Sequence, residues 1–152
     1  MLVLHVLGAI LGLGTNLTYG VIAALGERAG GPSRVFALRT IQALDRRLAN
    51  PAYMAQLVTG LILVWLLKID LFATSWLVTA LGLYVLVAVL GITVYGPVVR
   101  RQVALAEQVA AGEDEAAVDY AAVARRSTTL GITVTLMVIV IVVLMVVQPT
   151  LW

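Results

Sequence analysis

Long runs of apolar residues, separated by shorter polar stretches, cover most of this 152-residue chain. The runs extend over about residues 2–25, 51–67, 72–99 and 128–147. A helix of roughly 20 apolar residues crosses the hydrocarbon core of a bilayer. The first, third and fourth runs reach that length without an internal Asp, Glu, Lys or Arg, and the second is slightly shorter. The pattern predicts an all-α fold, a four-helix transmembrane bundle that forms a single integral membrane domain over residues 1–152.

Residues 31–50, between the first two runs, show a helical period of their own. Pro32 and Ser33 are typical of a helix start, and apolar residues then recur at helical spacing among arginines. We therefore expect a basic amphipathic interfacial helix, lying at the membrane surface or packing on the bundle. Asn50 and Pro51 predict a bend before the second span. Gly112 predicts the end of a helix that continues the third span.

Composition supports the membrane assignment and removes several kinds of chemistry. Hydrophobic residues make up 62% of the chain and charged residues 12%, whereas soluble domains are nearer half apolar and a quarter charged. The chain has no cysteine, which excludes disulfides, thiolate metal sites and cysteine nucleophiles. The net charge is +2, and the arginines cluster at membrane boundaries, so we expect lipid head groups and not nucleic acid as their partners.

The distribution of basic residues predicts an orientation, because short loops rich in Lys and Arg face the cytoplasm. The loop after the first span holds Arg28, Arg34, Arg39, Arg46 and Arg47, and the loop after the third span holds Arg100, Arg101, Arg125 and Arg126. The turn between the second and third spans holds only Lys68. We expect a bacterial cytoplasmic (inner) membrane protein with both long loops cytoplasmic and both termini outside. Trp65, Trp76 and Trp152 then fall near the outer boundary, as an aromatic belt does.

Polar and small residues inside the spans follow the helical repeat. In the first span, His5, Gly8, Gly12 and Asn16 share one face. Small residues let helices approach closely in membranes, and amide side chains bond across them. The second span offers Gln56 and Gly60 on one face. We expect these two faces to pack together, with a hydrogen bond between the amides of Asn16 and Gln56.

His5 is the only histidine and the clearest chemical candidate. An imidazole facing a bundle can bind haem iron, and a methionine can supply the second axial ligand. Met145, in the outer half of the fourth span, lies at a depth similar to that of His5. The same histidine can instead bond to a head group, to water or to a backbone carbonyl. The sequence leaves both interpretations open.

The layout resembles a known family. The residues that carry the resemblance are Leu4 to Ala9 (LHVLGA), Thr59-Gly60, Gly96 to Arg101 (GPVVRR), Arg125-Arg126 and Leu144 to Pro149 (LMVVQP). Together they resemble bacterial predicted integral membrane proteins of the domain-of-unknown-function 2269 family. His5 also gives a looser similarity to copper-resistance D and membrane protoporphyrinogen oxidase proteins. In the oxidase, a histidine near the outer end of the first span is implicated with haem.

Two functions are compatible with these observations. The first is a non-enzymatic membrane subunit or scaffold that packs on itself, as a homo-oligomer, or on a larger membrane complex. Packing explains every intramembrane feature except His5. The second is a small redox protein that binds haem b through His5. The spans carry no deep Asp, Glu, Lys or Arg, which disfavours a proton or ion pump because such pumps usually need one.

Overall fold

We analysed a computed structural model of the chain, which describes residues 1–150. The described residues form helices and connecting turns. The helices are α1 (Leu2–Ala29), α2 (Gly31–Leu44), η1 (Asp45–Ala49), α3 (Asn50–Leu66), α4 (Ser75–Leu90), η2 (Gly91–Tyr95), α5 (Gly96–Ala110) and α6 (Ala116–Val147), of which η1 and η2 are π-helical. Trp152 of the expected aromatic belt lies outside these residues.

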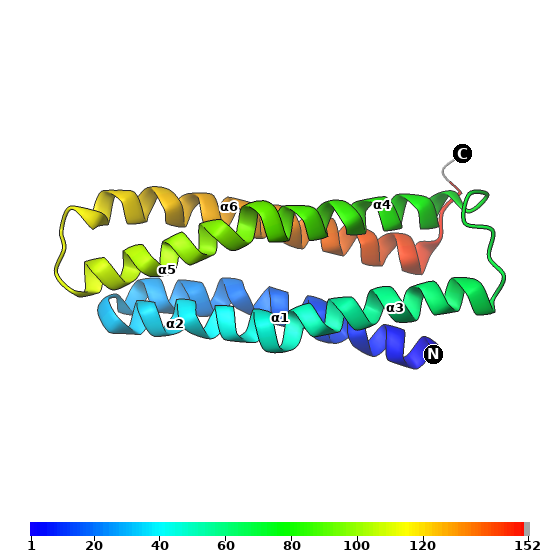
Figure 1. The fold of residues 1–152 in the computed structure, drawn as a ribbon, viewed down its shortest axis with the longest axis horizontal. Helices are drawn as coiled ribbons and strands as arrows, with labels where there is room; N and C mark the ends of the chain where they lie inside the picture. Colours follow the sequence, from blue (N-terminus) through cyan, green and yellow to red (C-terminus); the bar gives the residue numbers. More distant parts are fainter. Residues whose placement is uncertain (151–152) are drawn as a thin grey trace.

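The eight helical segments make four long rods (Figure 1). α2, η1 and α3 follow one another without a break over residues 31–66, and α4, η2 and α5 do the same over residues 75–110. Each of the four rods is long and apolar enough to cross a membrane. The predicted all-α bundle with four membrane-spanning helices is confirmed. A rod of 36 residues is about 54 Å long and therefore extends well past a core of about 30 Å.

The two ends of the bundle differ in charge. One end, called here the basic end, carries the α1–α2 turn and the α5–α6 turn, around which the arginines gather. The other, called the terminal end, carries the start of α1, the end of α6 and the α3–α4 connection (Figure 1). At the basic end, Gly112 follows α5 with a φ of 93°, as a glycine after a helix end does. The predicted helix stop at this position is confirmed.

The expected helix after the first span is present as α2. It begins at Gly31 with a proline in its first turn, and it packs against α1 and α5. The contact with α1 is close: a β-carbon on Gly26 would lie 2.5 Å from the β-carbon of Ala37. α2 thus packs on the bundle, which was one of its two expected placements. Its contact with lipid head groups stays a prediction.

Both π-helical segments end at a proline turn, and the helix continues through each of them. The bend expected at Asn50-Pro51 stays a prediction. The N–H of Asn50 bonds to the carbonyl of Asp45, and the N–H of Gly96 bonds to the carbonyl of Gly91. Pro51 and Pro97 follow directly. A proline has no N–H and its ring crowds the carbonyl four residues earlier. A wider π turn accommodates this crowding, so the helix continues through each proline.

The rods pack as two pairs. α1 lies against α2 and α3, while α6 lies against α4 and α5. At the basic end, α2 and α5 join the pairs around Leu38, Val103 and Tyr120. Nearer the terminal end, no Cα of α3 lies within 8 Å of a Cα of α4. The two pairs therefore meet through α2 and α5 at the basic end and through α1 and α6, and they are separated along α3 and α4.

Candidate functional site

A partly open cavity of about 470 Å³ lies between the two helix pairs. Its lining comes from both pairs, including α3 and α4, whose Cα atoms stay more than 8 Å apart. Toward the basic end the lining is polar, with Gln42, Asp45, Arg46, Asn50 and Arg100. Farther into the bundle it is mainly aliphatic, with two amides, Asn16 and Gln56, among Val87, Ala88, Val134, Val138, Ile141 and Val142. We call this cavity the cleft. The lining of the cleft thus changes from charged residues at one end to mainly aliphatic residues at the other, and an amphipathic molecule has the same change in polarity along its length.

Four of the chain's five tyrosines line the cleft. The hydroxyl of Tyr84 on α4 donates to the carbonyl of Tyr53 on α3, at 2.8 Å. The hydroxyl of Tyr53 donates to the carbonyl of Gly12, at 3.1 Å. Tyr19 and Tyr95 add aromatic surface from α1 and η2. Tyr84 thus links the two pairs where their backbones are apart.

Asp45 is the one carboxylate in the lining of the cleft. Asn50 donates a hydrogen bond to its Oδ2 at 3.1 Å, and the Tyr19 hydroxyl lies 3.5 Å from its Oδ1. Asp45 belongs to η1, outside the four apolar runs, and burial raises the pKa of its carboxyl. Within residues 1–150 it forms no ion pair. Half-buried carboxylates are usually compensated by a cation, so Asp45 has capacity to bind one.

Arg46 and Arg100 lie at the basic end of the cleft, and both are exposed. The guanidinium of Arg100 turns back along its helix, with Nη1 3.8 Å from where a β-carbon of Gly96 would lie. Neither arginine forms an ion pair with another described residue. The cleft therefore begins with two guanidinium groups that can bind an anion from outside the chain.

The packing of α1 on α3 places the predicted glycine face inside the bundle. A β-carbon would lie 3.4 Å from Gln56 Cβ at Gly8, 2.7 Å from the Tyr53 ring at Gly12, and 3.0 Å from His5 Cε1 at Gly60. These distances are too short for a larger residue at Gly12 without movement of the ring. The face that sequence patterning singled out is therefore occupied within the chain.

Asn16 links three helices, though with other partners than expected. Its amide donates to the hydroxyl of Tyr53 at 3.2 Å, and its carbonyl oxygen accepts from Thr135 of α6 at 3.0 Å. Asn16 bonds to these residues in place of the expected Gln56. The side chain of Asn16 therefore holds α6 to the α1–α3 pair at the wall of the cleft.

His5 is directed at α3. Its Nδ1 lies 3.1 Å from the carbonyl oxygen of Gln56 and 3.2 Å from Oγ1 of Thr59. The Thr59 hydroxyl itself donates to the carbonyl of Ala55, so the imidazole N–H donates from Nδ1 to α3. Met145 is half-buried on α6. Neither His5 nor Met145 is part of the lining of the cleft, and the imidazole bonds to α3 and not to the methionine.

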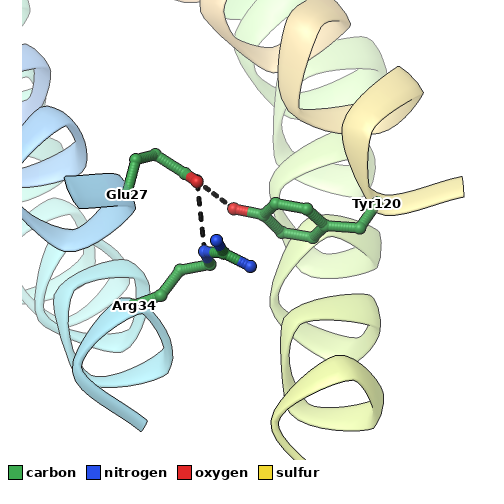
Figure 2. Close-up of polar contacts among 3 residues, drawn as sticks. All are labelled: Glu27, Arg34 and Tyr120. Atoms are coloured by element: carbon green, nitrogen blue, oxygen red, sulfur yellow. Dashed lines mark hydrogen bonds and ion pairs between the residues drawn. The ribbon is translucent and has the colours of Figure 1, made fainter. Parts of the chain in front are cut away.

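A second polar cluster holds the basic end closed (Figure 2). Arg34 Nε lies 3.1 Å from Oε2 of Glu27, and the guanidinium lies 4.7 Å from the centre of the Tyr120 ring. The hydroxyl of Tyr120 donates to Glu27. Burial and the bond to Glu27 raise the pKa of Tyr120 to about 12. This cluster ties α1 and α2 to α6, and sequence patterning did not indicate it.

Comparison with known proteins places the chain in a family. The family model described as "Predicted integral membrane protein (DUF2269)" matches residues 1–149. The chain belongs to this family. The resemblance drawn from the sequence is thereby confirmed. No curated protein and no solved structure matches this family member.

The cleft itself was missed by sequence reasoning. Its signal in the sequence is the recurrence of tyrosine within otherwise aliphatic spans, at Tyr19, Tyr53, Tyr84 and Tyr95. Buried tyrosine hydroxyls need hydrogen-bond partners. Such residues in three different spans are typical of a shared polar interior.

Proposed function

We propose that this integral membrane protein is a non-enzymatic membrane subunit that holds an amphipathic lipid in the cleft. One observation carries the proposal: a cavity of about 470 Å³ runs from a charged end to an aliphatic end between helices that do not close on one another. Ligand pockets commonly measure about 300–1,000 Å³. A lipid has a polar head group followed by apolar acyl chains, and the lining of the cleft likewise changes from charged to aliphatic residues.

The separation of α3 and α4 supports this proposal on energetic grounds. An empty cleft in a bundle forfeits dispersion contacts along its walls. Aliphatic residues such as Val134 and Val138 would regain those contacts with an acyl chain, which can enter from the bilayer between α3 and α4. A lipid that completes the packing explains why these two helices remain apart.

The lipid hypothesis is tested by filling the cleft. Ala88 lines the cleft and Ala55 is an exposed alanine of α3 outside its lining. Ala88→Phe should lower the amount of lipid retained by the purified full chain, measured by native mass spectrometry, while Ala55→Phe should leave it unchanged. Equal retention in the two variants, with both monodisperse and helical, would overturn the proposal.

Orientation and location are part of the same proposal. The protein lies in the bacterial inner membrane, with the basic end on the cytoplasmic side and both termini on the outer side. The reason is that nine arginines lie at one end of the bundle and Lys68 lies at the other. A cysteine tests this best at exposed Glu113, since Gly112 has a positive φ that strains any other residue. Impermeant thiol reagent added to intact cells should not label Glu113→Cys. Labelling there would reverse the orientation.

Association with a homo-oligomer or with a larger membrane complex is the remaining part of the subunit hypothesis. The Gly8 and Gly12 face is occupied by α3, so it is not available for a partner. Exposed glycines such as Gly14 and Gly82, with nothing within 4 Å, offer other close-approach points. Mass measurement of the detergent-solubilised full chain tests self-association. A monomer at all concentrations would exclude the homo-oligomer and leave association with a larger membrane complex as the remaining hypothesis.

Haem b binding through His5 is the second candidate, and one observation favours it. Nδ1 of His5 donates to a backbone carbonyl, the arrangement that orients many ligating imidazoles and leaves Nε2 as the ligand. Met145 is the proposed second ligand. Protein expressed with a supply of haem should then show a Soret band that His5→Ala removes. Colourless wild-type protein would leave His5 as a helix-packing residue.

A further inference from the structure

The charges around the cleft are of both signs, and none of them forms an ion pair within 4.0 Å in the described chain, although the charge of Arg46 acts on the neighbouring Asp45. Arg46 and Arg100 have no carboxylate within ion-pair distance, and the half-buried carboxylate of Asp45 has no cation within that distance. All three line the same polar end of one cavity. A ligand that carried only a negative charge would satisfy the arginines and repel Asp45. A ligand that carried only a positive charge would do the reverse.

Resting on the proposed lipid site, we propose that its ligand is a zwitterionic phospholipid with a primary amine, of the phosphatidylethanolamine type. The phosphate lies at Arg46 and Arg100, and the ammonium lies at Asp45. The acyl chain occupies the aliphatic part of the cleft.

The hydrogen bonds of Asp45 favour an ammonium that carries N–H groups. Asn50 uses Oδ2, and the Tyr19 hydroxyl approaches Oδ1 at the long distance of 3.5 Å. A carboxylate accepts about four hydrogen bonds, so at least two positions remain. A primary ammonium brings three N–H donors and fills them. A trimethylammonium brings none and would leave the acceptors unsatisfied.

The arginines suit the neighbouring phosphate. A guanidinium presents its N–H groups in a planar fork that matches phosphate oxygens. Arg46 directly follows Asp45 in η1, so the two side chains leave the helix in different directions, and both line the cleft. In a phosphatidylethanolamine head group the phosphate and the ammonium are separated by two carbons, which lets one head group reach both.

The experiment compares three lipids on the delipidated full chain. Phosphatidylethanolamine, phosphatidylcholine and phosphatidylglycerol of identical acyl chains are added in turn, and binding is measured by native mass spectrometry. We expect phosphatidylethanolamine to bind about tenfold more tightly than the other two, the effect of one charge-assisted hydrogen bond. Asp45→Asn keeps the shape and the bond from Asn50, and should bring phosphatidylethanolamine and phosphatidylcholine to within about twofold of each other. Phosphatidylglycerol, no longer repelled by Asp45, should then bind at least as tightly as these two.

The arginine variants test the phosphate position. Arg46→Gln should weaken binding of all three lipids by about fivefold and leave their order unchanged. Arg47→Gln is the matched control, because Arg47 is the exposed next residue and lies outside the cleft lining. An equal effect of both substitutions would place the phosphate elsewhere and overturn the assignment.

Failure of this inference is distinct from failure of the proposed function. Equal binding of the three lipids by the wild-type chain, still reduced by Ala88→Phe, would overturn the head-group assignment and leave the lipid site standing. Lipid binding insensitive to Ala88→Phe would overturn the site itself. A preference for phosphatidylethanolamine that persists in Asp45→Asn would also overturn the assignment of the amine. The preference is a ratio within one folded sample, so partial loss of protein does not affect it.

Discussion

Gly12 is the position at which a single added methyl group tests the packing of α1 on α3. A β-carbon there would lie 2.7 Å from Cε1 and 3.0 Å from Cδ1 of the Tyr53 ring. The ring would have to move until these distances reached the 3.4 Å of ordinary contact. It cannot do so freely, because its hydroxyl donates to the Gly12 carbonyl and accepts from Asn16.

The cost is isolated by a matched substitution two residues along the same helix. Gly14 has nothing within 4 Å of its β-carbon position, so Gly14→Ala measures the helix-propensity gain alone, about 0.8–1 kcal/mol in water. Gly12→Ala has the same gain plus an overpacking cost of about 1–3 kcal/mol. The propensity cancels in the difference. We therefore expect Gly12→Ala to be about 1–3 kcal/mol less stable than Gly14→Ala.

Equilibrium unfolding by SDS in mixed micelles, followed by circular dichroism, measures this difference. Replacing Tyr53 by leucine removes the ring atoms that the added β-carbon would meet, so the penalty of Gly12→Ala should shrink in that background, as a double-mutant cycle shows. Equal stabilities of Gly12→Ala and Gly14→Ala in the wild-type background would refute the close packing of α1 on Tyr53.

Three further changes test other parts of the bundle. Gly26→Ala should destabilise the basic end by about 1–3 kcal/mol, because the added β-carbon would lie 2.5 Å from the β-carbon of Ala37. The loss should lower the protection of the α2 amides from hydrogen exchange, and unchanged protection would contradict the prediction. Asn16→Ala should cost about 0.6–2 kcal/mol in SDS unfolding. Thr135→Val should add little in that background, because the partner of Thr135 across the helices is Asn16. Tyr120 has a folded pKa of about 12, raised from 10.0, so it stabilises the fold below its unfolded pKa and that contribution is lost as pH rises from 10 to 12. Between pH 10 and 12 the Tyr120→Phe variant should lose less thermal stability than the wild-type chain. The same pH profile in the variant and in the wild-type chain would contradict the prediction.

The four spans could be predicted because a run of about 20 apolar residues leaves the backbone few alternatives in a membrane. The continuation of the third span up to Gly112 was also predicted, whereas the unbroken passage from α2 into α3 was not. Asn50-Pro51 was expected to bend the chain before the second span, since a proline disturbs the carbonyl four residues before it. Local propensity does not indicate that the chain will adopt a π turn at that point, as it does at Asp45–Ala49 and Gly91–Tyr95.

The candidate site depended still more on tertiary structure. The helical repeat placed Gly8, Gly12 and Asn16 on one face, and that face does pack on α3. The partner of Asn16 was missed because depth in the membrane was the only available constraint, and Tyr53 and Thr135 lie at a suitable depth as well as Gln56. The cleft depends on how far α3 stands from α4, and a sequence pattern gives no lateral distance between two helices.

The continuity of the rods has a consequence for how another protein could recognise this one. At the basic end, the connections between helices are confined to Gly30 and to residues 111–115, whereas the arginines on that side lie within helices. Proteases cut exposed and locally unfolded segments, so trypsin should leave most of these arginines intact in the folded chain. A protease specific for glutamate should instead cut first at Glu113 or Glu115. Recognition at this end would depend on rigid helical surface and not on an extended peptide.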